Sequence, residues 1–76
     1  MRLYVPVGKS AGIRPGDLVG AIANEANVDS AQIGSIEITD KFSLVEVPEA
    51  AADSIIAALS RSTIRGKRVK VRRERF

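Results

Sequence analysis

The stretch IGSIEITDKFSLVEV, residues 33–47, alternates apolar and polar side chains along two successive runs. Alternation with a period of two is typical of a strand that buries one face and exposes the other. We therefore predict strands at about 33–39 and 42–47. Asp40 and Lys41 connect them, which makes the pair a β-hairpin.

A helix is predicted on each side of this hairpin. Pro15 and Pro48 both suit the first turn of a helix, where an N–H would have no partner, and apolar residues with helical spacing follow each of them. We predict helices at about 15–27 and 48–60. Gly20 lies inside the first helix at a cost of about 1 kcal/mol relative to Ala, which predicts that it packs closely against a neighbour.

Strands are predicted at both ends of the chain. Residues 2–7 alternate with Tyr4 on the outward side, and residues 67–72 alternate with their valines inward, after a short strand at 63–64. The resulting order is βαββαβ. With both helices on one face of a four-stranded antiparallel sheet, this is the ferredoxin-like split βαβ arrangement, an α+β fold. The length of 76 residues suits a single domain, which we place at 1–76.

The composition excludes several classes of function. Cysteine and histidine are both absent, so thiolate nucleophiles, iron–sulfur clusters and the usual neutral-pH base are missing. Gly8-Lys9-Ser10 resembles the end of a phosphate-binding loop, but that motif needs a glycine where Leu3 stands. No apolar run approaches the roughly 20 residues that span a bilayer. We expect a soluble cytoplasmic domain that binds rather than catalyses and needs no metal, cofactor, membrane or small-molecule ligand.

Positive charge is concentrated at the end of the chain. Residues 1–64 hold five basic side chains against eight acidic ones, whereas residues 65–76 hold seven basic side chains against Glu74 alone. Such an asymmetry is typical of a segment that binds a polyanion. Because Val69 and Val71 alternate with the charges, we expect the charges to project from an ordered strand.

The sheet face away from the helices is predicted to carry the binding residues. Tyr4 and Phe42 fall on this face, where an aromatic ring can stack with a base for about 1–3 kcal/mol. Glu37 and Glu46 fall on it too and weaken its positive field. The basic residues predicted to lie beside the rings are Arg68, Lys70 and Arg72.

Several segments resemble a known family. Leu3-Tyr4-Val5 resembles the first signature of RNA-recognition motifs, residues 41–47 resemble the second, and residues 64–71 resemble their final hairpin and strand. The segment GIRPGDLVGAIA, residues 12–23, closely resembles the DbpA-type RNA-binding domain of bacterial DEAD-box RNA helicases, in particular the cold-shock DeaD branch. Leu44 departs from the motif, because it stands where the second signature has another stacking aromatic residue.

The resemblance implies an RNA-binding module that anchors a DEAD-box helicase core, in the same chain, to structured or ribosomal RNA, in ribosome assembly or cold-shock RNA remodelling. The domain itself would be non-catalytic, and its parent protein would be an ATP-dependent RNA helicase. The alternative is a ferredoxin-like regulatory or protein-interaction domain that uses the same sheet face. The candidate RNA contacts, on the sheet, in the loops and in the C-terminal segment, are Tyr4, Lys9, Arg14, Lys41, Phe42, Arg65, Lys67, Arg68, Lys70, Arg72 and Arg73.

Overall fold

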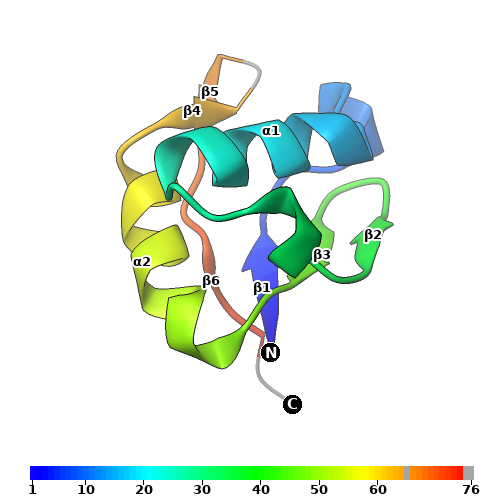
Figure 1. The fold of residues 1–76 in the computed structure, drawn as a ribbon. Coiled ribbons are helices and arrows are strands. Elements are labelled where there is room, and N and C mark those ends of the chain that lie inside the picture. The colour runs from blue at the N-terminus through cyan, green and yellow to red at the C-terminus, as the bar shows by residue number, and fades with distance from the viewer. Residues whose placement is uncertain (65, 75–76) are drawn as a thin grey trace.

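Two helices lie on one face of a four-stranded antiparallel sheet (Figure 1). The structure is a computed structural model and describes residues 1–64 and 66–74, with the backbone alone at Lys67. Within these residues the elements are β1 (Arg2–Val5), the 3-10 turn η1 (Lys9–Ala11), α1 (Pro15–Glu25), the 3-10 turn η2 (Ser30–Gln32), β2 (Ile36–Ile38), β3 (Ser43–Glu46), α2 (Glu49–Ser60), β4 (Thr63–Ile64), β5 (Lys67–Arg68) and β6 (Arg72–Arg73).

The strand order β2-β3-β1-β6 confirms the predicted ferredoxin-like fold. β1 is central and pairs with β3 on one side, where Tyr4 lies opposite Leu44. On its other side β1 pairs with β6, where Tyr4 lies opposite Arg72. β2 completes the sheet as the outer partner of β3, with Glu37 opposite Leu44. The central position of β1 places its outward side chains in the middle of the open sheet face, the face that the helices leave uncovered.

The core lies between the sheet and the two helices. Alternate residues of β1 and β3 point toward the helices, because successive side chains of a strand point to opposite faces. Each helix packs an apolar stripe, whose residues have helical spacing, against these strand residues. The fully buried members of the core are Leu3, Val5, Leu18, Ile22, Val45, Ala52, Ile55 and Leu59.

Ser43 is a buried polar residue within this apolar environment. Its hydroxyl donates a hydrogen bond of 2.7 Å to the carbonyl oxygen of Val7, the second residue after β1. A buried carbonyl that has a partner avoids the cost of losing its water. Ser43 therefore fixes the direction in which the chain leaves β1 toward η1.

The helices match their predicted positions to within two residues. At the start of α1 the N–H of Arg14 donates to Oδ2 of Asp17 at 2.9 Å, which satisfies a helix-terminal amide. The chain turns away after α1 at Asn27, whose φ of 55° is left-handed. The prediction that Gly20 packs closely against a neighbour is wrong, because no atom lies within 4 Å of where its Cβ would stand.

The predicted final strand at 67–72 is wrong. β5 pairs with β4 in a separate two-stranded sheet, and β6 at Arg72–Arg73 alone pairs with β1. Extending the β1–β6 register would place Pro6 opposite Lys70, but Pro6 has no N–H to donate. The N–H of Val7 bonds instead to the carbonyl oxygen of Val5 at 2.8 Å, so the ladder stops there.

The other strands are shorter than predicted, since β1 ends at Val5 rather than at residue 7 and β2 spans three residues of the predicted 33–39. In the described chain, no helix has the length and apolar character that crossing a membrane requires.

Candidate nucleic-acid interface

An aromatic and cationic row crosses the open sheet face. The rings of Tyr4 and Phe42 are stacked, with centroids 5.2 Å apart and planes inclined by 23°. The guanidinium carbon of Arg72 lies 4.7 Å from the centroid of the Tyr4 ring. Because β3 and β6 flank β1 on opposite sides, Phe42 and Arg72 approach the Tyr4 ring from opposite sides. We call these three residues the Tyr4 stack; its members lie on the face predicted for them.

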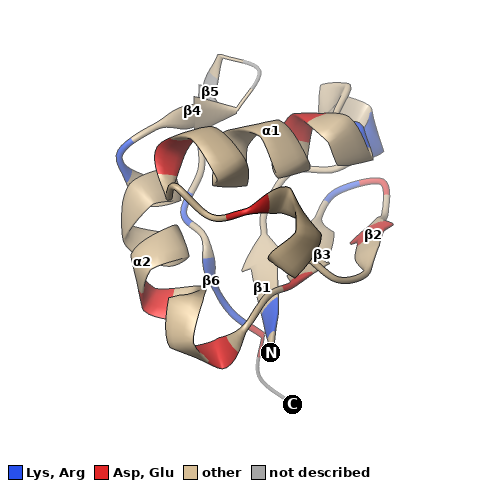
Figure 2. Cartoon of the chain, in the orientation of Figure 1, with Lys and Arg blue, Asp and Glu red and all other residues tan. Residues whose placement is uncertain are grey.

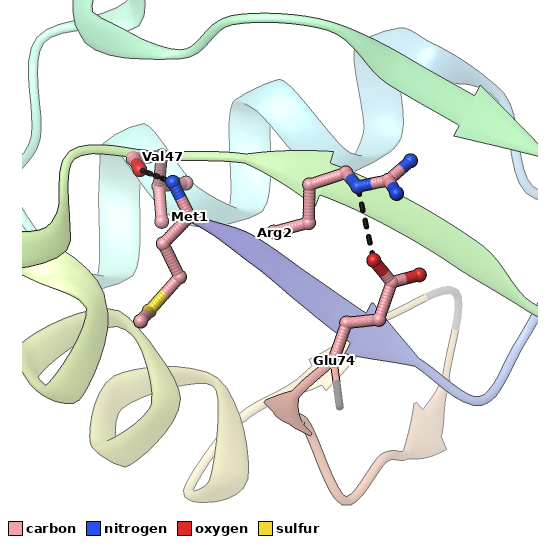
Figure 3. A network of polar contacts seen from close by, with 4 residues as sticks. All are labelled: Met1, Arg2, Val47 and Glu74. Carbon is pink, nitrogen blue, oxygen red and sulfur yellow. Dashed lines mark hydrogen bonds and ion pairs between the residues drawn. The ribbon is translucent and has the colours of Figure 1, made fainter. Parts of the chain in front are cut away.

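A second row of charged residues lies beside the Tyr4 stack. Arg2 is opposite Glu46 on β3, and its carbonyl accepts the N–H of Glu74 at 3.0 Å. Its Nε lies 3.0 Å from Oε1 of Glu74 (Figure 3). Met1 and Val47 hold the start of β1 in place through paired backbone bonds, of which Figure 3 draws the one from the Met1 amino group, 3.2 Å long.

The two rows border a hollow of about 250 Å³, lined by Tyr4, Phe42, Arg72, Arg73 and Glu74. Tyr4 and Phe42 are half-buried and Arg72 is exposed. The hollow thus combines aromatic faces, a guanidinium group and a carboxylate. Such a combination of apolar walls with a few polar groups is typical of small ligand sites.

Leu44 is buried although its register places it on the open face, opposite both Tyr4 and Glu37. It stands outside the core cluster that the helices cover. It therefore adds apolar support beneath the row and offers no ring to a base, as expected from its departure from the motif.

The first loop is bound to the β2–β3 turn. The N–H of Lys9 donates to the carbonyl of Thr39, and the N–H of Ser10 donates to that of Asp40, both at 2.9 Å. Gly8 allows this approach, because a Cβ there would collide with the Thr39 carbonyl oxygen. The two exposed lysines of these loops, Lys9 and Lys41, are thereby brought to the same end of the sheet.

Thr39 fixes the backbone that carries the Phe42 ring. Its hydroxyl donates to the Phe42 carbonyl at 2.8 Å and accepts the Phe42 N–H at 3.2 Å. The Thr39 N–H also donates to the Phe42 carbonyl at 2.8 Å. This clamp holds the ring in position for its contact with Tyr4.

Two residues predicted beside Tyr4 lie elsewhere. Arg68 is exposed on β5, opposite Thr63 in the two-stranded sheet. Lys70 is exposed in the segment between β5 and β6, flanked by the buried Val69 and Val71. The inward orientation predicted for both valines is confirmed, whereas Arg68 does not belong to the four-stranded sheet because the ladder ends before it.

Arg73 lines the hollow, but its side chain extends toward α2. Its guanidinium lies 2.6 Å from Oδ1 of Asp53 on α2, as expected for a residue opposite the inward Leu3. Arg14 is exposed immediately before α1. Arg65 and the side chain of Lys67 lie outside what the structure describes.

Carboxylates gather on the helical layer (Figure 2). α1 contains Asp17 and Glu25, and α2 contains Glu49 and Asp53. The sheet and the loops beside it hold charges of both signs. The helical layer therefore repels a polyanion.

Glu74 belongs to this surface but was not predicted from the sequence. In the sequence, Glu74 is simply the only acidic residue of the basic segment 65–76. Its two-residue spacing from Arg72 was the available signal, since that spacing places both side chains on the same sheet face. Its ion pair with Arg2, 72 positions earlier, has no local signature.

Comparisons with known proteins show which family the chain resembles. Residues 2–73 match the family model of the DbpA RNA binding domain. The "ATP-dependent RNA helicase DeaD" of Mycobacterium tuberculosis (strain H37Rv) is 40% identical over 68 residues, which cover 90% of this chain and 12% of that protein. The "ATP-dependent RNA helicase DbpA" of Bacillus subtilis is 37% identical over 71 residues, which cover 93% of this chain and 15% of that protein. A DeaD helicase of Buchnera aphidicola is 31% identical over 68 residues, which cover 90% of this chain and 11% of that protein.

The chain thus spans only about a tenth of the length of the curated helicases that it matches. The family match, in contrast, covers nearly all of it. The resemblance expected from residues 12–23 is confirmed, and the chain belongs to the family of DbpA RNA-binding domains.

Proposed function

We propose that this RNA-binding domain anchors a DEAD-box helicase core, carried in the same parent chain, to structured RNA during ribosome assembly or cold-shock RNA remodelling in the cytoplasm. The observation that carries the proposal is the Tyr4 stack, which lies on the sheet face that no helix covers. The names of the relatives and the small share of their length that the chain covers support a parent helicase.

The Tyr4 ring already contacts the Phe42 ring and the guanidinium group of Arg72. A base therefore stacks at an end of the row, on Phe42 or on the planar guanidinium group of Arg72, rather than directly on Tyr4. Arginine suits this role because its planar group both stacks and neutralises phosphate. Tyr4 acts as the support that holds the two outer groups apart.

Phosphates are contacted around this row. Lys9 and Lys41 lie at one end of the sheet, and Arg68 and Lys70 are exposed in the segments that lead into β6. Each contact to a phosphate releases counterions and makes binding depend on salt. A domain with this surface raises the local RNA concentration for a tethered helicase core without taking part in ATP hydrolysis.

A salt titration with an RNA hairpin tests the proposal. The affinity of the 76-residue chain is measured by fluorescence anisotropy between about 50 and 200 mM salt. Lys9→Gln with Lys41→Gln is expected to lower the log–log slope by about 0.7–0.9 for each phosphate that is no longer neutralised. Arg61→Gln is the matched control, because Arg61 is an exposed cation beyond the end of α2. Absence of RNA binding at low salt would contradict the proposal.

The anchoring role is tested on the parent protein. Deleting this domain is expected to reduce unwinding of a duplex joined to the hairpin, while unwinding of the duplex alone stays the same. Equal loss on both substrates, or loss on neither, contradicts anchoring.

A further inference from the structure

We propose that the outer edge of β2 is a docking site for a basic, extended segment of another protein, which pairs with β2 and adds a strand to the sheet. The segment that fits this edge has alternating apolar and basic side chains. The inference goes beyond the proposed function, because it assigns a protein partner to a strand edge that the proposed RNA contacts do not include. Figure 1 shows β2 at the outer edge of the sheet, where β3 is its single neighbouring strand in the described chain.

The backbone of β2 presents hydrogen-bonding groups along this edge. The N–H of Thr39 donates to the carbonyl of Phe42, so Thr39 faces β3. Successive residues of an antiparallel strand alternate in this respect, so Glu37 also faces β3, whereas Ile36 and Ile38 direct their N–H and C=O groups outward. Outside the β2–β3 pair, no backbone group of another described residue bonds to these two isoleucines. An extended peptide can pair with such an edge through main-chain hydrogen bonds.

The same edge leaves part of the apolar core open. Ile36 is opposite the buried Val45, and Ile36 and Ile38 are half-buried and pack against the core. Val28 and Ile33, which precede β2, are half-buried there too. A strand that pairs with β2 would place alternate side chains beside the isoleucines. Apolar residues are favoured at those positions, because they remove apolar surface from water.

The charge on this side of the domain favours a basic partner. Residues 15–40, which form α1, η2 and β2, hold five acidic side chains and no basic one. Figure 2 shows these carboxylates on α1, beside η2, on β2 and in the turn after it. Glu37 is exposed in the middle of β2, where a residue of an added strand would lie directly opposite it. Opposite charges stabilise such a cross-strand pair, so Lys or Arg is favoured at that position of the partner.

The same charges disfavour two other occupants of this edge. Antiparallel pairing of β2 with β2 of a second copy, centred on Glu37, would place two Glu37 carboxylates opposite each other, which is destabilising. RNA is a polyanion, and the carboxylates of residues 15–40 repel it. The basic alternating segment of this chain is already engaged, because its Val69 and Val71 are buried in the core. The occupant that fits is thus a segment of a different protein.

The test uses the acetylated and amidated peptide SVRVKVRVS with the ¹⁵N-labelled 76-residue chain. Amide chemical shifts report the affinity and the location of binding, and amide hydrogen exchange reports new backbone hydrogen bonds. The amides of Ile36 and Ile38 are expected to shift. At a free peptide concentration of about ten times Kd they should exchange about tenfold more slowly, because binding protects them from the solvent.

Two further peptides test the two parts of the proposed chemistry. The scrambled peptide SVVRRVVKS has the composition and charge of SVRVKVRVS but lacks its alternation. The peptide SVEVEVEVS keeps the alternation but has the opposite charge. Both are expected to bind at least about fivefold more weakly than SVRVKVRVS, because each loses one of the two contributions to pairing.

Two variants assign the charge preference to the β2 edge. Glu37→Lys replaces a favourable cross-strand pair by an unfavourable one, so the affinity for SVRVKVRVS should fall at least about fivefold and that for SVEVEVEVS should rise. Glu49→Lys is the matched control, because it makes the same change at an exposed position on α2. It should change either affinity by less than about twofold. Circular dichroism verifies that both variants are folded.

The remaining outcomes overturn the inference. Absence of peptide binding, equal binding of the scrambled peptide, or shifts confined to residues outside β2 contradicts strand addition. An unchanged affinity in Glu37→Lys contradicts the choice of a basic partner. A dimer of the free chain that protects Ile36 and Ile38 would assign the edge to a second copy, and shifts of these amides caused by the RNA hairpin would assign it to RNA. The salt titration with the hairpin tests RNA binding separately.

Discussion

The ring of Tyr4 is stacked on the ring of Phe42 at a centroid distance of 5.2 Å. Tyr4 belongs to the central strand β1, whereas Phe42 precedes β3 and is held by the Thr39 turn. The contact therefore joins the sheet to the β2–β3 turn, and through that turn to the first loop at Lys9. A short series of hydrogen bonds thus joins the stack to the lysines at the end of the sheet.

Tyr4→Ala is expected to weaken RNA binding more than folding. The aromatic pair contributes about 0.5–1.5 kcal/mol and the cation–π contact about 0.5–1 kcal/mol, so the free energy of unfolding should fall by about 1–2.5 kcal/mol. Chemical denaturation measures this change, and anisotropy with the hairpin measures the affinity. Binding that falls only in proportion to the folded fraction would show that Tyr4 has a structural role alone.

Arg72→Lys separates stacking from charge. Lysine keeps the positive charge but lacks the planar group that lies over Tyr4. We expect the salt dependence of RNA binding to stay the same while the affinity falls about threefold to tenfold, since a cation–π contact is worth about 0.5–1 kcal/mol and stacking with a base adds to it. Arg68→Lys is the control, because Arg68 lies on the separate β4–β5 sheet. Equal effects of the two substitutions contradict a stacking role for Arg72.

Ser43→Ala is expected to lower the free energy of unfolding by about 1–3 kcal/mol, because the Val7 carbonyl loses its buried hydroxyl donor. In a domain of this size each kcal/mol corresponds to a decrease in Tm of about 4–8 °C. Thermal melting measures the shift. Ser35→Ala, at an exposed position before β2, is the control and should leave Tm unchanged. Equal Tm values for the two variants would show that the Ser43 hydrogen bond does not stabilise the domain.

Two glycine substitutions are expected to change stability in opposite directions. Gly20→Ala should stabilise the domain by up to about 1 kcal/mol, because alanine favours the helix and the space beside Gly20 is open. Gly8→Ala should destabilise it, because the new Cβ meets the carbonyl oxygen of Thr39 and the backbone of Phe42. Urea denaturation of both variants checks these signs. A stable Gly8→Ala variant with unchanged RNA affinity would show that the first loop does not need its close approach to the turn.

The periodic parts of the fold were determined by the sequence alone. The alternation at 33–47 and the helical spacing after Pro15 and Pro48 depend on neighbouring residues, and the structure contains the hairpin and both helices there. The same alternation placed Tyr4, Phe42 and Arg72 on the open sheet face. Local patterns are sufficient for such features, because side-chain direction along a strand or helix follows from backbone geometry.

The tertiary structure decided where the last segment pairs and what its charges contact. Periodicity predicted a single strand at 67–72, but the ladder ends where Pro6 offers no N–H. The same segment sends Arg73 to Asp53 on α2 and Glu74 to Arg2 on β1. These partners lie far away in the sequence, and only the packed sheet and helices bring them together. The hollow beside the Tyr4 stack depends on these long-range interactions, so no local pattern in the sequence predicts it.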